Sequence, residues 1–155
     1  MEQIQDYIKL RGSLQIALCD PDGLVVKKQI IENTVVTVGR VWILQQIESV
    51  NINTNLTVNN LAIGSSTVAP TTGDTALGAE VLRVSIATFS TVNLTANPPS
   101  WQAQVSFSTS QANTTLAEAG LFNSNAAGTM IAHATFASFV KATSNTLNIS
   151  WNISG

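Results

Sequence analysis

The stretch Thr146-Leu147-Asn148-Ile149-Ser150-Trp151-Asn152-Ile153 places an apolar residue at every second position, with Asn or Ser between them. Alternation of this kind indicates a β-strand with one face in a core and the other face toward solvent. The same period of two recurs near residues 84–95, 101–109, 116–122 and 129–136. Many short strands separated by turn signals predict a mainly β fold, an antiparallel sandwich or barrel. We expect a jelly-roll-like β-sandwich.

The same half of the chain is almost free of charge. Between Val84 and Gly155 the two fixed charges are Glu118 and Lys141, and His133 is the sole imidazole. The other fourteen charged residues lie within the first 83 positions. Catalysis needs groups that move protons, hold metals or stabilise developing charge. The composition therefore argues against an enzyme and favours a rigid domain that binds other proteins.

Length and net charge set further limits. A chain of 155 residues is expected to form one domain. Its net charge of −2, with Lys27-Lys28 as the only basic pair, gives no electrostatic footprint for nucleic acid. No apolar run approaches the ~20 residues that span a bilayer, and Met1–Asp6 lacks the features of a signal peptide. We expect no membrane segment, synthesis in a cytosol, and a core position for the single Cys19.

The first 32 residues predict an arm followed by a β-hairpin. Spacings of three and four, typical of a short amphipathic helix or an ordered arm, separate Ile4, Tyr7, Ile8 and Arg11. Such an arm is too short to be stable alone, so it must pack on its own domain or on a neighbour. Within residues 14–31, Asp20-Pro21-Asp22-Gly23 is a strong type I turn signal. We expect residues 1–32 to pack on, or form part of, a sandwich domain at 33–155.

One or two short helices are expected in the second segment. A helix over roughly 34–48 could be capped by Asn33 or Thr34, although its β-branched residues weaken the pattern. A second helix is expected from Asp74 to about Arg83, because Asp is a favoured N-cap residue. An Asn- and Thr-rich stretch predicts a loop over 50–60.

Motifs for catalysis and ligand binding are absent or weak. The sequence contains no Walker loop, dinucleotide fingerprint or nucleophile elbow. A catalytic triad would need His133, which lies on a predicted strand among small and apolar residues, so we interpret it as a structural histidine. Glu118 is expected to pair with Arg83, or alternatively with Lys141, inside the uncharged sandwich. No catalytic, cofactor or metal site is predicted.

The three tryptophans, Trp42, Trp101 and Trp151, lie in apolar-periodic segments. They could stack on sugars, but packing in the core or in a subunit interface fits their surroundings better. Trp101 follows Asn97-Pro98-Pro99-Ser100 and is the best candidate for an exposed contact. The predicted partner interface therefore consists of Ile4, Tyr7, Ile8, Arg11 and Trp101.

Four segments, in this order, resemble a group of small virion proteins of tailed bacteriophages. They are Asn33–Arg40, Leu61–Gly64 with Thr75–Arg83, Glu118–Asn123 and Gly128–Phe136. The resemblance spans about residues 33–153. It implies a non-enzymatic β-sandwich subunit that forms a homotrimer and binds a protein shell. It also implies a location in the virion, on the capsid exterior, after assembly in the cytoplasm of the bacterial host.

Such proteins serve as capsid decoration (cement) subunits or as tail-fibre-like structural proteins. A chain of this length, without a long stalk or collagen-like repeat, favours a decoration subunit bound to the major capsid protein. A tail or receptor-binding component is the alternative, and a carbohydrate-binding module is the second; their partners would be tail proteins or a host surface glycan. A neutral Ser/Thr/Asn surface suits all of these, because many copies can pack without accumulated repulsion.

Overall fold

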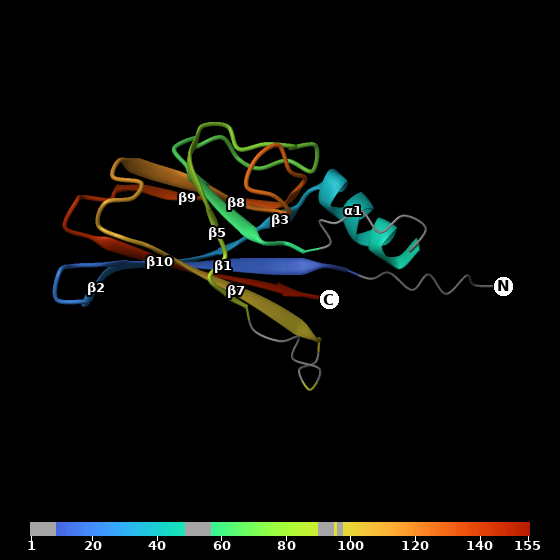
Figure 1. Cartoon of the computed structure of the whole chain (residues 1–155), viewed down its shortest axis with the longest axis horizontal. Coiled ribbons are helices and arrows are strands. Elements are labelled where there is room, and N and C mark those ends of the chain that lie inside the picture. The colour runs from blue at the N-terminus through green and yellow to red at the C-terminus, as the bar shows by residue number, and fades with distance from the viewer. Residues whose placement is uncertain (1–8, 49–56, 90–94, 96–97) are drawn as a thin grey trace.

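The computed structural model describes residues 9–48, 57–89, 95 and 98–155 (Figure 1). These residues form ten strands and one helix, which confirms the mainly β prediction. In chain order the elements are β1 Arg11–Cys19, β2 Val25–Glu32, β3 Thr34–Val35, α1 Thr37–Glu48, β4 Asn60–Gly64, β5 Glu80–Ser85, β6 Thr88–Phe89, β7 Ser100–Phe107, β8 Thr115–Phe122, β9 Met130–Val140 and β10 Thr146–Ser154.

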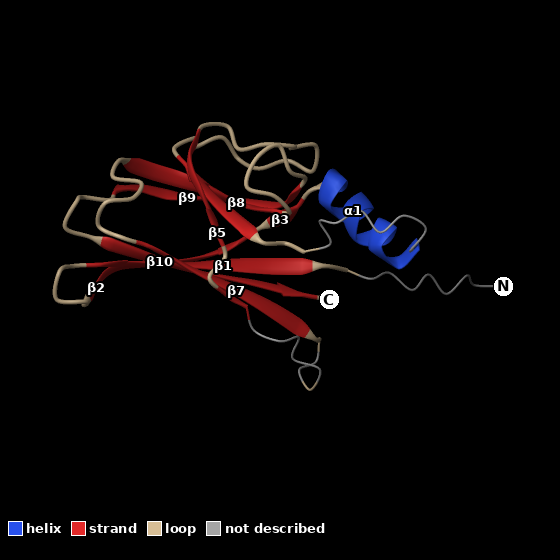
Figure 2. Cartoon of the chain, in the orientation of Figure 1, coloured by secondary structure: helices blue, strands red, loops and turns tan. Residues whose placement is uncertain are grey.

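The strands form two antiparallel sheets of five strands each, which lie one over the other in a sandwich-like arrangement (Figure 2). Sheet A has the order β2-β1-β10-β7-β6, and sheet B has the order β3-β9-β8-β4-β5. The start of β1, the end of β10 and helix α1 lie at the same end of the sandwich (Figure 1). None of the helices in the described part of the chain has the length and apolar character needed to cross a membrane.

The core follows from the period-two pattern. In β10, Leu147, Ile149 and Trp151 are buried, while Asn148 between them is exposed. They pack with inward-facing residues of both sheets, such as Leu121 of β8, into one apolar cluster. Because each large apolar side chain contributes about 1.5–3 kcal/mol when buried, this cluster is the main source of stability.

The predicted hairpin is confirmed, and it belongs to the main sandwich because β1 lies between β2 and β10. The Asp20 carboxylate accepts hydrogen bonds from the backbone N–H groups of Asp22 and Leu24, at 3.0 and 2.9 Å. Gly23 has a φ of +81°, which other L-residues adopt only with strain. Cys19 ends β1 as a buried free thiol, as predicted.

Gln29 connects the two sheets at the β2 edge. Its Nε2 donates to the carbonyl of Ala137 on β9 at 2.8 Å, and its Oε1 accepts from the N–H of Ala137 at 3.0 Å. A side-chain amide therefore replaces backbone pairing here and protects part of an edge strand.

The first predicted helix is confirmed as α1, but it begins at Thr37 and the proposed caps are wrong. Thr34 is in β3 and pairs with His133 of β9. The side chain of Asn33 accepts a hydrogen bond from Trp151 Nε1 at 3.2 Å, so it is engaged with the core. A Cβ atom added at Gly39 would overlap the backbone of Ile131, because α1 packs closely on β9 there.

The second predicted helix, from Asp74 to Arg83, is wrong. Residues 65–79 form an irregular segment, here called the covering loop, and β5 begins at Glu80. The backbone N–H groups of Gly78 and Ala79 donate to the Glu118 carboxylate, so they cannot form helical hydrogen bonds. The strand predicted over 84–95 is also divided, since β5 joins sheet B and β6 joins sheet A.

Several predictions concern residues outside the described part of the chain. Ile4, Tyr7 and Ile8 of the proposed arm lie there, and so does most of the loop predicted over 50–60. Arg11 is the first residue of β1 and is exposed.

Candidate functional site

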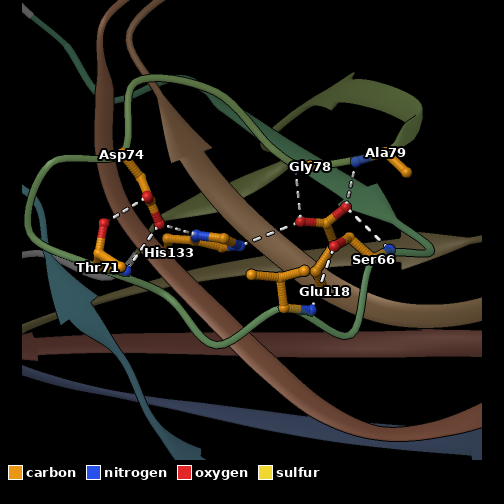
Figure 3. A network of polar contacts seen from close by, with 8 residues as sticks. Ser66, Thr71, Asp74, Gly78, Ala79, Glu118 and His133 are labelled. Carbon is orange, nitrogen blue, oxygen red and sulfur yellow. Dashed lines mark hydrogen bonds and ion pairs between the residues drawn. The ribbon is translucent and has the colours of Figure 1, made fainter.

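A buried polar network lies on the outer face of sheet B (Figure 3). His133 on β9 contacts Asp74 Oδ2 through Nδ1 at 2.7 Å and Glu118 Oε2 through Nε2 at 3.1 Å. Glu118 points away from the main core, because its neighbours on β8, such as Ala119, face into that core. Asp74 belongs to the covering loop, which closes over this face of the sheet.

Glu118 is fully buried, and backbone donors from the covering loop surround its carboxylate (Figure 3). Oε1 accepts the N–H groups of Ser66 at 3.1 Å and Ala79 at 2.7 Å, and Oε2 accepts that of Gly78 at 2.9 Å. A Cβ atom added at Gly64 would lie 2.5 Å from Glu118 Oε1, so a larger residue at this position of β4 would force the carboxylate or the covering loop to move. The carboxylate therefore holds the covering loop on the sheet.

The partners of the two ring nitrogens determine whether His133 can transfer a proton to or from a substrate. Each ring nitrogen faces a carboxylate oxygen, and only the imidazolium form offers an N–H to both. Hydrogen bonds from the side chain and then the backbone of Thr71 lower the pKa of Asp74 to about 2, with a smaller contribution from His133. With both nitrogens occupied, His133 has no free position for general-base catalysis.

The predicted ion pair between Arg83 and Glu118 is wrong. Arg83 forms a bidentate pair with Glu80, at 3.0 Å from Nε to Oε1 and 2.7 Å from Nη2 to Oε2. Its guanidinium carbon also lies 3.5 Å from the centroid of the Phe122 ring, and Nη1 donates to the carbonyl of Ser124. Besides His133, three backbone N–H groups surround Glu118, and charge patterns in a sequence do not show partners of that kind.

Lys141, the alternative partner for Glu118, is also buried elsewhere. Its Nζ donates to the carbonyl of Ser108 and to Oδ1 of Asn113, both at 2.8 Å. Loss of solvation lowers the pKa of Lys141 below its usual value. The two fixed charges of the uncharged half therefore stabilise two different loops.

Trp101 is half-buried at the α1 end of the sandwich. Its ring lies 5.8 Å from that of Phe89, with an interplanar angle of 32°. The two rings border an apolar cavity of about 440 Å³, which is also lined by Trp42, Ile43, Val58, Ile131 and Ile153. An apolar side chain or the apolar face of a sugar ring matches such a surface.

The outer face of sheet A carries charge at its β2 edge, where Lys28 and Glu32 are exposed, and at Arg11. The rest of this face, across β1, β10, β7 and β6, is uncharged and polar and is here called the bare face. Its outward positions are Ser13, Gln15 and Ala17 on β1, Asn148, Ser150 and Asn152 on β10, Gln102, Gln104 and Ser106 on β7, and Thr88 on β6. Gln104 Nε2 donates to Gln102 Oε1 at 2.9 Å along β7. A shallow hollow of about 360 Å³ lies over the middle of the face, beside Gln104 and Ser150.

The structure brings together a set of residues that sequence reasoning had separated. His133 is buried with a partner at each ring nitrogen, as expected for a structural histidine, but its partner Asp74 was assigned to a helix cap. The spacing of Thr71 and Asp74 could have indicated a turn instead, because Thr71 donates to that carboxylate through both N–H and Oγ1.

Among the described residues, no three His, Cys, Asp or Glu side chains are grouped so as to hold a metal ion. Comparisons of the chain with protein-family models, with curated proteins and with solved structures found no match.

Proposed function

We propose that this chain is a non-enzymatic structural subunit of a tailed-bacteriophage virion. Its leading role is that of a capsid decoration (cement) protein that binds and stabilises the lattice of the major capsid protein as a homotrimer. The bare face of sheet A is the observation that carries the proposal. The bare face supports a protein-binding role for this chain. The sequence resemblance supports the assignment of that role to a bacteriophage virion.

The chemistry of the bare face favours close packing against protein. Forming an interface there removes no charged group from water, which is the costliest desolvation in association. Its amides and hydroxyls can each donate and accept hydrogen bonds, so they can pair with backbone or polar groups of a partner. Gln15, Gln104 and Asn148 are exposed and available for this.

The closed network around His133 supports the non-enzymatic part of the proposal. Both oxygens of Glu118 and both nitrogens of His133 are engaged within the protein. Groups held in this way stabilise a loop and leave no reactive atom oriented toward a substrate.

We also propose that the sandwich has a jelly-roll-like topology. The chain crosses between the sheets at β2–β3, β5–β6, β7–β8 and β9–β10, as expected for such sandwiches. The β1–β2, β4–β5 and β8–β9 pairs instead stay within one sheet.

Electron cryomicroscopy of the native particle that contains this chain tests the proposal. We expect density for three copies around symmetry axes on the outside of an icosahedral shell, with the bare face against protein. Density confined to the tail would overturn the capsid assignment. Density on the shell with the bare face toward solvent would retain the location but reject the proposed contact surface.

A receptor-binding tail component is the second candidate, and the cavity beside Trp101 favours it. Trp101 and Phe89 offer an aromatic surface of the kind that stacks on sugar rings. Under this role Trp101→Ala should slow adsorption of the particle to its host and abolish glycan binding by the isolated protein. Unchanged adsorption would remove Trp101 from this role.

A further inference from the structure

A polar pocket of about 550 Å³ opens beside the start of β1, where the chain passes from sheet A to sheet B. Its size lies within the range of about 300–1,000 Å³ that is common for ligand pockets. Three cations line it, with Lys9 and Arg11 at the start of β1 and Arg40 on α1. Within the described part of the chain, none of the three forms an ion pair.

Asn33 presents a hydrogen-bond donor of fixed orientation in the wall of this pocket. Its Oδ1 accepts from Trp151 Nε1, which can only donate, so the amide cannot be turned around. Its Nδ2 is buried and has no acceptor in the part of the chain that the structure describes. Gly12 makes this arrangement possible, because a Cβ atom there would overlap the Asn33 side chain. A buried donor without a partner costs free energy, so an acceptor supplied by a ligand would stabilise the site.

Two further groups narrow the class of ligand. Asn152 also lines the pocket, and among the described residues its buried Oδ1 has no donor. Glu32 at the end of β2 adds a carboxylate to the wall, so the pocket also offers an acceptor to an N–H group of a ligand. The ligand should therefore carry negative charge for the three cations, an acceptor for Asn33 and a donor for Asn152. A peptide that contains acidic side chains combines all three, because its backbone supplies both N–H and C=O groups.

We propose that this pocket binds an acidic peptide segment of a partner protein. Carboxylates of the segment lie among Lys9, Arg11 and Arg40, and its backbone pairs with Asn33 and Asn152. The pocket adjoins one end of the bare face, because Ser13 and Asn152 line both, and the peptide would bind there whether the protein decorates a capsid or a tail.

Binding can be measured with the full-length protein and a fluorescein-labelled peptide, Gly-Ser-Asp-Glu-Asp-Ser-Gly, by fluorescence anisotropy. The matched neutral peptide is Gly-Ser-Asn-Gln-Asn-Ser-Gly. We expect the acidic peptide to bind at least about tenfold more tightly, and the difference to shrink as salt is raised. Equal affinity for both peptides, or no binding at millimolar concentration, overturns the proposal. Displacement of the peptide by inorganic phosphate at the peptide's own Kd would identify a simple anion site and reject the peptide assignment.

Two single substitutions test whether the peptide binds in this pocket. Arg40→Gln removes one exposed cation of the pocket and should weaken binding about tenfold. Lys28→Gln removes the same charge from an exposed position of β2 outside the pocket and should leave the affinity unchanged. If the two variants weaken binding equally, only net charge matters and the proposed site is wrong.

Asn33→Asp tests the oriented donor. It keeps an oxygen for Trp151 Nε1 but replaces the buried Nδ2 donor with an oxygen and adds negative charge to the pocket wall. We expect peptide binding to be lost while thermal unfolding stays cooperative. Retained binding by a folded Asn33→Asp variant contradicts the role of Asn33, and Arg40→Gln decides the question if that variant does not fold.

Discussion

The outer face of sheet B is covered by the chain's own loop 65–79, whereas no other described element covers the bare face of sheet A. Beneath the covering loop, a small apolar cluster accompanies the charged network; it consists of Val36, Ala62, Leu77, Phe122 and Met130. The bare face has neither an apolar cluster nor a charge on its outward positions from Ser13 to Thr88. Sheet B therefore holds the covering loop through the buried charge of Glu118.

In this molecule a buried charge stabilises the fold where hydrogen-bond partners surround it. Glu118 and His133 are stabilising only because Asp74 and three backbone N–H groups complete their hydrogen bonds. A buried charge that loses such partners is strongly destabilising. An uncharged polar face avoids that requirement and can pair with a partner whose groups are not fixed in advance.

The largest effect is expected for Glu118→Gln. The amide nitrogen would face N–H donors that now point at a carboxylate, so the free energy of unfolding should fall by about 3 kcal/mol. Chemical denaturation at neutral pH measures this. Glu80→Gln is the matched control, because Glu80 forms a more exposed pair with Arg83 and should cost about 1 kcal/mol or less. Equal losses in the two variants would show that the network contributes no special stability.

A smaller effect is expected for Gly64→Ala. The new Cβ would lie 2.5 Å from both the Ala79 carbonyl oxygen and Glu118 Oε1, so the covering loop must move. Overpacking of this kind costs about 1–3 kcal/mol, and we expect about 2 kcal/mol by denaturation. Gly73→Ala is the control in the same loop, since its nearest neighbour would be Thr71 Oγ1 at 3.8 Å. A loss at Gly64 no larger than at Gly73 would contradict the close contact.

The third effect depends on pH. Asp74 has a folded-state pKa of about 2, below the unfolded value of 3.8. Its carboxylate therefore stabilises the fold above pH 4, and this contribution is lost as pH falls from about 4 to 2. Asp74→Asn should lower the free energy of unfolding at pH 6 by about 1 kcal/mol after solvent screening.

The same experiment should show a flatter loss of stability between pH 4 and 2 in Asp74→Asn than in the natural chain. Thr71→Val removes the Oγ1 donor, the largest cause of the lowered pKa, and should flatten the profile in part. If Asp74→Asn follows the natural profile through this range, the acid sensitivity arises elsewhere.

The sequence predicted the strands and the hairpin because their causes are local. Alternation in β10 and the Asp20–Gly23 turn depend on neighbouring residues alone. The site depends on topology: β8, β9 and the covering loop bring Glu118, His133 and Asp74 together from distant positions. Asp74 shows the limit most clearly, because it does accept a backbone N–H, as a helix cap does, but from the preceding Thr71.

The smallest effect on stability, and the sharpest test of the bare face, is expected for Gln104→Glu. Gln104 is exposed on β7 between Ser150 of β10 and Thr88 of β6. A surface charge there should change the free energy of unfolding by about 0.5 kcal/mol or less. Against a partner protein the same carboxylate would be desolvated without a counter-ion, so attachment should weaken at least about tenfold. Co-sedimentation of the purified variant with particles that lack the protein measures this loss.

Gln45→Glu makes the identical chemical change at an exposed position of α1, away from both sheet faces. If binding requires the bare face, Gln45→Glu attaches normally while Gln104→Glu does not, and both unfold like the natural chain. If both variants attach normally, the partner meets another surface, and the absence of charge on the bare face has no role in assembly. If both fail equally, general repulsion between protein and particle explains the loss. Only the first result makes the uncharged face itself the reason for attachment.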